Sequence, residues 1–157
     1  MDDIISEIKS DLSTAIGSAI KTYYYGEVVL VPRSYLPALM IYGNSTTLVA
    51  KSTAKDQTVH EITIRVVYDI APRFDEDGTG VTMLAHQDLI KIMEERDANM
   101  IPKSTTVLGV LRRNISGTDY LFNNDIRINY KTLQQGEFFY IAAECTISAV
   151  TNLVLRS

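Results

Sequence analysis

Residues that commonly carry catalysis are scarce in this chain. It holds two histidines, His60 and His86, and one cysteine, Cys145. A hydroxyl or thiol nucleophile needs a base within hydrogen-bonding reach, but no nucleophile elbow, Walker loop, dinucleotide fingerprint or HExxH motif occurs. We interpret His60 as a satisfied strand residue, His86 as an ordinary helix residue and Cys145 as a small buried hydrophobe. The sequence therefore favours a protein without catalytic activity.

One acidic run superficially resembles a calcium loop. Asp75, Glu76 and Asp77 are followed closely by Gly78 and Gly80. An EF-hand loop alternates its ligands and places a glycine sixth and a glutamate twelfth, and this spacing does not match. A single cysteine also excludes a cysteine zinc cage and an internal disulfide. We expect an exposed acidic turn here, with no bound metal and no cofactor.

Basic residues do not gather into a nucleic-acid-binding stripe. Arg112 and Arg113 form the only adjacent basic pair, and Lys51 and Lys55 lie apart in a polar stretch. The chain has 15 Lys and Arg against 19 Asp and Glu, a formal charge of −4. This balance argues against a protein whose main task is to grip phosphates. Tyrosines 23–25 lack basic neighbours, so we expect them to cover a sheet edge or a subunit contact.

Two helices and a set of strands must position these residues. The chain has 157 residues, 46% hydrophobic and 22% charged, which is typical of one globular domain. Residues 2–22 place apolar side chains on one arc and polar ones opposite, which predicts an amphipathic helix that Gly26 can terminate. A second helix is predicted over 81–98, after a loop at 71–80.

The strands are predicted from alternation and from short apolar runs. Residues 58–70 alternate most clearly and predict a long strand at the centre of the sheet. The polar stretch 43–57 before it predicts a long exposed loop or a projecting hairpin. A further polar loop is expected at 112–124, and the other predicted strands are 27–31, 36–42, 104–111, 125–132 and 137–153.

This element order predicts the fold class. The sequence α-β-β-β-α-β-β-β is mixed but not alternating, which favours a single α+β domain with a mixed, mostly antiparallel sheet and helices on one face. The start Met1-Asp2-Asp3 is unlike a secretory signal, and no apolar run approaches the length that spans a bilayer. We expect a soluble intracellular protein with no membrane partner.

The chain resembles the tail terminator proteins of long-tailed bacteriophages. The resemblance rests on an amphipathic N-terminal helix, the hydrophobic-Pro-Ala strand at 36–42, a long polar excursion, the alternating strand at 58–68 and a closing antiparallel pair within 125–150. It implies a structural protein that forms a homo-oligomeric ring, a hexamer, on the tail tube. It also implies that the ring stops tube polymerisation and joins the head–tail connector, without catalysis.

The resemblance also implies a place and a set of partners. The protein would assemble in the host cytoplasm and remain in the virion, at the head-proximal end of the tail. Its partners would be its own copies, the tail tube protein and the connector. Duplex DNA would pass through the ring without specific binding, and a net negative subunit suits that passage because basic linings hold phosphates.

Three polar segments are our hypothetical contact elements for the lumen, the tube or the connector. They are the stretch 43–57, the acidic turn 75–77 and the loop 112–124, and their candidate residues are Lys51, Lys55, Asp75, Glu76, Asp77, Arg112 and Arg113. Other functions remain open at this stage. One is another neck ring protein, such as a head-completion stopper. Another is a small cytoplasmic enzyme or ligand-binding domain around His60, His86 and Asp88, and a third, which the acidic charge disfavours, is a nucleic-acid-binding module.

Overall fold

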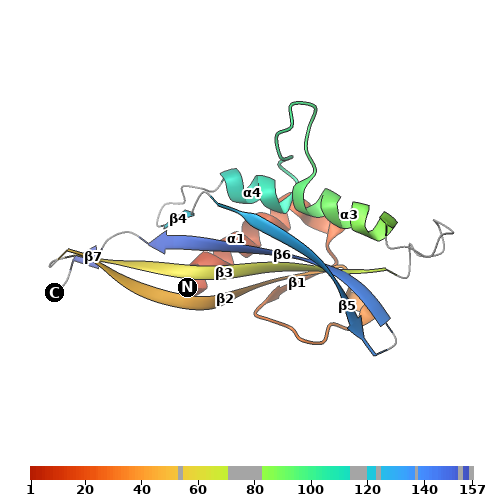
Figure 1. Ribbon diagram of the computed structural model, residues 1–157, viewed down its shortest axis with the longest axis horizontal. Coiled ribbons are helices and arrows are strands. Elements are labelled where there is room, and N and C mark those ends of the chain that lie inside the picture. Colours follow the sequence, from red (N-terminus) through yellow and green to blue (C-terminus); the bar gives the residue numbers. More distant parts are fainter. Residues whose placement is uncertain are drawn as a thin grey trace.

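A sheet of long strands runs along the longest axis of the molecule (Figure 1). The computed structural model describes residues 1–52, 55–70, 83–113, 120–122, 125–136, 138–151 and 154–155. The helices are α1 (Asp2–Ile16), α3 (Met83–Glu94) and α4 (Val107–Arg113). The strands are β1 (Thr22–Tyr25), β2 (Ala38–Ser52), β3 (Lys55–Asp69), β4 (Tyr120–Phe122), β5 (Arg127–Gln135), β6 (Phe138–Thr151) and β7 (Val154–Leu155).

The central strand is β3, as the alternation predicted. The order across the sheet is β1-β2-β3-β6-β4, while β5 also pairs with β6 and β7 pairs with the start of β3. Only the pair of β1 with β2 is parallel among the described strands, and the others are antiparallel. The predicted α+β class with a mixed, mostly antiparallel sheet is confirmed.

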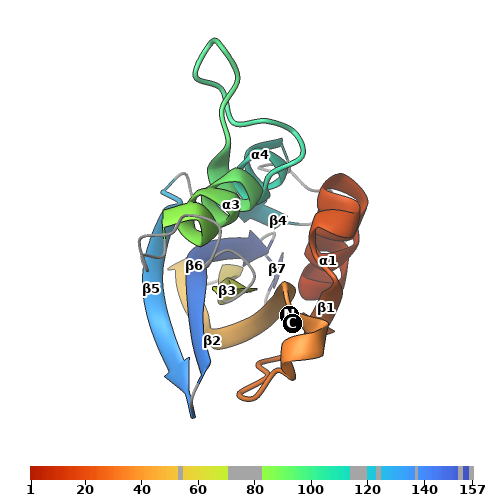
Figure 2. The same cartoon turned by 90° about the vertical axis from the view of Figure 1, so that its right-hand side faces the viewer.

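One face of the sheet forms the main core with the helices. Figure 2 shows α1, α3 and α4 on the same side of the sheet, which curves around them. Alternate residues of β3 point into this core, because successive side chains of a strand face opposite sides. The core includes Ile5, Ile8 and Leu12 from α1, Leu39 and Ile41 from β2, Ile62, Ile64 and Val66 from β3, Leu89 and Met93 from α3, Leu111 from α4, and Ala143, Cys145 and Ile147 from β6.

The opposite face of the sheet is covered only in part. Residues 27–37, which we call the strap, run from β1 to β2 and include a short 3-10 turn at Arg33–Tyr35. Val31 and Leu36 of the strap pack on that face in a second, smaller cluster. The sheet residues of that cluster are Ala38, Met40, Val67, Tyr140 and Ala142.

The predicted first helix is shorter than expected. It ends at Ile16, because Gly17 adopts a positive φ of 61° and its N–H bonds to the carbonyl of Ser13. A 3-10 turn follows at Gly17–Ala19, and the tyrosines that come after the predicted helix form the parallel edge strand β1. Gly26, with φ 103°, therefore ends a strand and not a helix.

Several other boundaries differ from the prediction. Residues 104–111 are not a strand, because most of them belong to α4, and residues 27–31 belong to the strap. The polar stretch 43–57 takes the second of its two predicted forms, a hairpin, which the ends of β2 and β3 make. α3 ends at Glu94 and not near residue 98, and Arg112 and Arg113 close α4 and do not open a loop. The predicted loop at 71–80 lies outside the described residues.

Helix α1 should contribute strongly to stability through its buried stripe. Leu12 is fully buried, so Leu12→Ala should lower the free energy of unfolding by about 2–5 kcal/mol. The neighbouring Ser13 is exposed, and Ser13→Ala should change that free energy by less than about 0.5 kcal/mol. Urea denaturation of both variants measures the difference, and equal effects would show that α1 is not packed as described.

Candidate interaction surfaces

The residues considered for catalysis lie in separate environments. His86 on α3 contacts the ring of Tyr130, with ring centroids 5.0 Å apart. Asp88 instead accepts a hydrogen bond of 3.0 Å from the hydroxyl of Tyr68. His60 lies on β3, bonded to a threonine of β2. Each residue of the hypothetical catalytic group thus has its own neighbours, and the described part of the chain holds no group of three or more His, Cys, Asp or Glu that could bind a metal.

Cys145 is a core residue. Its side chain is fully buried on the helix-covered face of β6. Burial raises the pKa of its thiol to about 12, so the thiolate is scarcely populated near neutral pH. The prediction of a small buried hydrophobe is confirmed.

The predicted contact residues are spread over the molecule. Lys51 and Lys55 occupy the far end of the β2–β3 hairpin, whereas Arg112 and Arg113 end α4, well away from it (Figure 1). Both arginines are exposed, and Nη2 of Arg113 donates to the carbonyl of Ser104 at 2.8 Å. Asp75, Glu76 and Asp77 lie outside the described residues.

The hairpin itself is a long projecting element, which we call the arm (residues 43–52 and 55–60). It extends past the helices toward one end of the molecule (Figure 1). Residues 43–48 are all exposed, and Leu48 keeps 66% of its surface accessible. Register shifts interrupt the pairing at Gly43/Ser45 and at Ala50/Ser52, and such bulges increase strand twist. The arm therefore presents exposed backbone and side chains away from the core.

A second projection, which we call the knob (residues 95–103), rises between α3 and α4 (Figures 1 and 2). Its base is closed by a backbone hydrogen bond of 2.8 Å from Lys103 N–H to the carbonyl of Glu95 and by their ion pair at 2.9 Å. An isolated β-bridge joins Arg96 to Pro102 above this base. Gly109 of α4 packs so closely on the Lys103 carbonyl that a Cβ would overlap it. The base is thus anchored to the helical layer.

The tip of the knob is held in one conformation by its own polar groups. Oδ1 of Asp97 accepts hydrogen bonds from the N–H groups of Asn99 at 2.8 Å and Ile101 at 3.0 Å. Met100 has a positive φ of 63°, and its carbonyl accepts a hydrogen bond of 2.9 Å from Nη1 of Arg96. Despite this order, Met100 and Ile101 remain 69% and 55% exposed. The knob holds two apolar side chains out in solvent.

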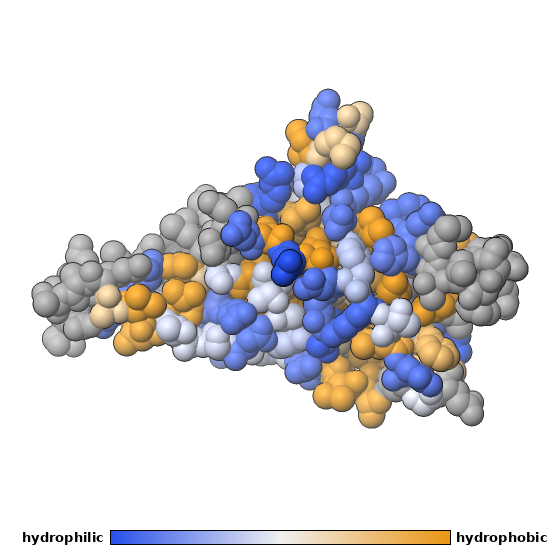
Figure 3. Space-filling model, viewed as in Figure 1, coloured by the Kyte–Doolittle hydropathy of each residue, from blue (hydrophilic) through white to orange (hydrophobic). Residues whose placement is uncertain are grey.

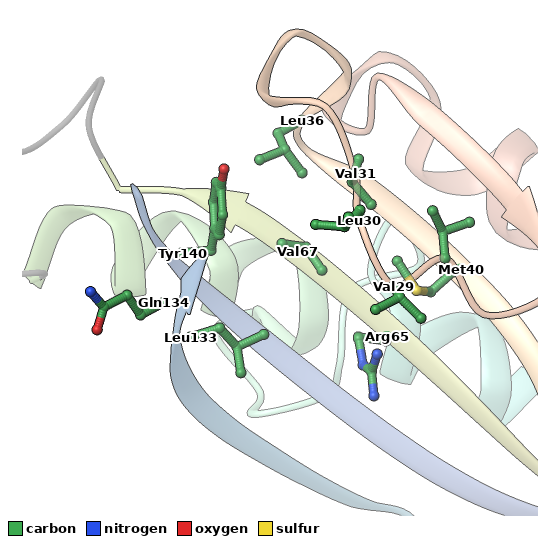
Figure 4. Close-up of a pocket in the computed structure, with 11 residues that line it drawn as sticks. Val29, Leu30, Val31, Leu36, Met40, Arg65, Val67, Leu133, Gln134 and Tyr140 are labelled. Carbon is green, nitrogen blue, oxygen red and sulfur yellow. The ribbon is translucent and has the colours of Figure 1, made fainter. Parts of the chain in front are cut away.

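An apolar groove lies on the other side of the sheet, between the strap and the strands (Figure 4). Its volume is about 320 Å³. Val29 and Leu30, on the outer wall, are 86% and 65% exposed. The lining residues are Val28, Val29, Leu30, Val31, Leu36, Met40, Arg65, Val67, Leu133, Gln134 and Tyr140. Figure 3 shows hydrophobic surface at the lower margin of the molecule in the view of Figure 1, where the strap lies.

The strap that forms the groove wall is fixed by polar contacts. Arg33 pairs with Asp69 at 2.5 Å and lies over the ring of Phe138, 5.1 Å from its centroid. Phe138 is 46% exposed, so the guanidinium connects the strap to the apolar end of the β5–β6 hairpin. The groove is therefore bounded on both sides by side chains held in place.

The charges beside the groove compensate one another. Arg65 donates to Glu144 at 2.7 Å and to Glu27 at 3.2 Å, and Lys131 approaches Glu144 at 2.6 Å. Burial alone would raise the pKa of Glu144, but hydrogen bonds from Lys131 and Arg65 lower it by more, so its pKa lies below the usual value. Glu144 therefore stays ionised and the network contributes little net charge at the groove.

Sequence reasoning missed both the knob and the groove. Residues 95–103 carry the turn formers Asp97 and Asn99 and a proline around Met100 and Ile101, a signal for a structured turn with an apolar tip. Residues 27–31 of the strap were predicted to be a short strand because valine, which occurs there three times, favours extended backbone. Their exposure depends on long-range packing, which no local pattern reports.

Comparisons with known proteins assign no family. No protein-family model matches the chain, and no curated protein matches it. Among the described helices, none combines the length and the apolar character needed to cross a bilayer. A functional conclusion must therefore come from the surfaces of this molecule and from the sequence resemblance.

The order of the knob should depend on the Asp97 carboxylate. Asp97→Ala removes the acceptor of two backbone hydrogen bonds, so the amides of Asn99 and Ile101 should exchange faster with solvent. The global free energy of unfolding should change by less than about 1 kcal/mol, because the knob lies outside the core. Asp97→Asn keeps an acceptor oxygen and serves as the matched control. Unchanged exchange in Asp97→Ala would show that the tip is ordered by other contacts.

His60 should make the fold less stable in mild acid. It is buried, Nδ1 lies 3.0 Å from the Thr46 hydroxyl, and burial lowers its pKa below the usual value. The unfolded chain then binds the proton more readily, so stability falls as the pH drops below about 6.5. Between neutral and mildly acidic pH, the free energy of unfolding measured in urea should fall less for His60→Gln than for the wild type. Identical pH profiles for wild type and His60→Gln would contradict this role.

Proposed function

We propose that this protein is a structural subunit of a long-tailed bacteriophage that caps the tail tube as a ring, in the manner of a tail terminator. The ring ends tube polymerisation and presents the surface that joins the head connector. Its copies form the ring, most simply a hexamer, and duplex DNA passes through the middle. The protein then belongs to the virion, at the head-proximal end of the tail.

The arm is the observation that carries this proposal. A monomeric domain has no need of a projecting hairpin whose residues 43–48 are all exposed and whose outer strand, β2, extends past its pairing with β1. Exposed strands are prone to pair with other chains, so proteins retain them mainly where a partner covers them. An element of this reach suits a subunit that must contact a tube and a connector as well as its neighbours.

The fold and the charge support the same proposal. The mixed sheet with helices on one face agrees with what the resemblance to tail terminators implies. The formal charge of −4 suits a ring that DNA must cross without being held, because release of counterions from bound phosphates is what makes basic surfaces grip DNA. Within the described residues, His60, His86 and Asp88 form no common site, which weakens the enzyme alternative.

Shortening the arm tests the proposal. Thr47 pairs directly with Val59, so residues 48–58 can be replaced by an Asn-Gly turn that keeps the register. The shortened protein should fold, with circular dichroism and thermal unfolding close to wild type, because the main core is untouched. In the phage that encodes it, the shortened protein should fail to restore tails of normal length, as judged by electron microscopy of particles.

Two full-length variants serve as controls for the shortened arm. Leu48→Ser changes one exposed side chain, and the double substitution Lys51→Ala and Lys55→Ala removes the charges while keeping the length. Normal tails with the shortened arm would overturn the proposal. Normal tails on heads that leak DNA, when the protein is missing altogether, would assign it instead to a stopper ring at the neck.

A further inference from the structure

The strap is joined to the rest of the molecule by backbone hydrogen bonds only at its two ends, as far as the chain is described. At one end the N–H of Gly26 donates to the carbonyl of Ile41 at 2.8 Å, and at the other the carbonyl of Pro37 accepts from the N–H of Lys21 at 2.8 Å. The described backbone hydrogen bonds of residues 27–36 stay inside the strap. Side chains alone therefore hold the middle of the strap against the sheet.

The apolar side chains of the strap are divided between the sheet and solvent. Val31 and Leu36 are each only 8% exposed, whereas Val29, Leu30 and Tyr35 are all exposed. The groove of about 320 Å³ also leaves part of the surface beneath the strap uncovered. Closing the strap thus buries only some of its apolar side chains, while every ordered residue loses conformational entropy. Apolar burial by itself favours the closed position only weakly.

Two ion pairs supply further attachment. Arg33 pairs with Asp69 at 2.5 Å and lies over the ring of Phe138, and Glu27 pairs with Arg65 at 3.2 Å. The side chains of Arg33 and Glu27 are 43% and 49% exposed, so dissolved salt screens both pairs. The attachment of the strap to the sheet should therefore depend on ionic strength.

We propose that the strap is a lid, which opens as one unit about its two ends while the sheet and the helices stay folded. Segments with few buried contacts and few backbone hydrogen bonds open at a lower free energy than the whole domain. Opening uncovers Met40 and Ala142 of the smaller cluster, whose side chains are fully buried under the closed strap. The contacts of Arg33 keep the lid closed, so they control how much apolar surface this face of the sheet exposes.

Thiol labelling measures the opening of the lid. Met40→Cys places a thiol in the cluster under the strap, while the native Cys145 is fully buried in the main core and reports unfolding of the whole domain. Each labelling rate with N-ethylmaleimide, an uncharged reagent, is divided by the rate in the urea-unfolded chain. The introduced thiol should then react at least about tenfold faster than Cys145, as peptide mass spectrometry can measure. Equal rates would show that the strap opens only with global unfolding, and would overturn the inference.

Arg33→Gln tests whether the ion pair keeps the lid closed. It removes the pair with Asp69 and the contact with Phe138, so the introduced thiol should react about five- to tenfold faster while the rate of Cys145 stays unchanged. About 0.5 M sodium chloride should accelerate labelling more in the chain with Arg33 than in Arg33→Gln. The matched control Arg113→Gln makes the same substitution on α4 and should change the rate less than about twofold. An unchanged rate in Arg33→Gln would contradict the lid.

A second thiol position removes the effect of the cavity that Met40→Cys creates. Ala142→Cys lies in the same cluster and deletes no atoms, so its thiol should show the same excess over Cys145 and the same response to Arg33→Gln. A response at one position only would indicate a local gap and not the opening of the strap, and would also overturn the inference. The lid is independent of the proposed tail function, because the strap and the arm share no residues and shortening the arm leaves the strap unchanged.

Discussion

The register of β3 is the constraint on which the rest of the structure depends. β3 pairs with β2 along one edge and with β6 from Val59 to Asp69 along the other. Ile62, Ile64 and Val66 face the helices only in this register, because a shift by one residue would turn every side chain to the opposite face. Both neighbouring strands repeat the alternation, so their apolar residues reach the same core. The helices can then cover this core on one face of the sheet.

Because the helices cover one face of the sheet, the opposite face carries a different set of side chains. It holds the compensated ion pairs of Arg65 with Glu144 and Glu27, which suit a surface near water. The strap covers only one end of it, and the groove forms where that cover is incomplete. The knob meanwhile grows from the connection between α3 and α4, on the helix side. The sheet is covered differently on its two faces. The molecule therefore has the knob on its helix side and the groove on its strap side.

The periodicity of apolar residues predicted the elements that have a regular buried face. It failed where one or two specific contacts determine the secondary structure. α1, β3 and β6 follow from their apolar patterns. α4 was predicted as a strand because its valines and the threonines before it favour extended backbone. However, the Thr106 hydroxyl accepts the Gly109 N–H at 3.0 Å and caps the helix. Gly109 also has no side chain, so the Lys103 carbonyl can lie close to its Cα. The first helix was predicted to continue to residue 22 because nothing in the local pattern marks the positive φ of Gly17.

The candidate surfaces also differ in how far the sequence predicts them. The arm was predicted as a projection, since fifteen polar-rich residues cannot be buried. The groove depends on residues far apart in the sequence, such as Arg33 with Asp69 and Leu133 with Leu30, and only the fold brings these together. The arm and the knob also differ in how they could contact other molecules. The arm extends away from the core by its length, whereas the knob presents only two exposed apolar side chains on a fixed loop.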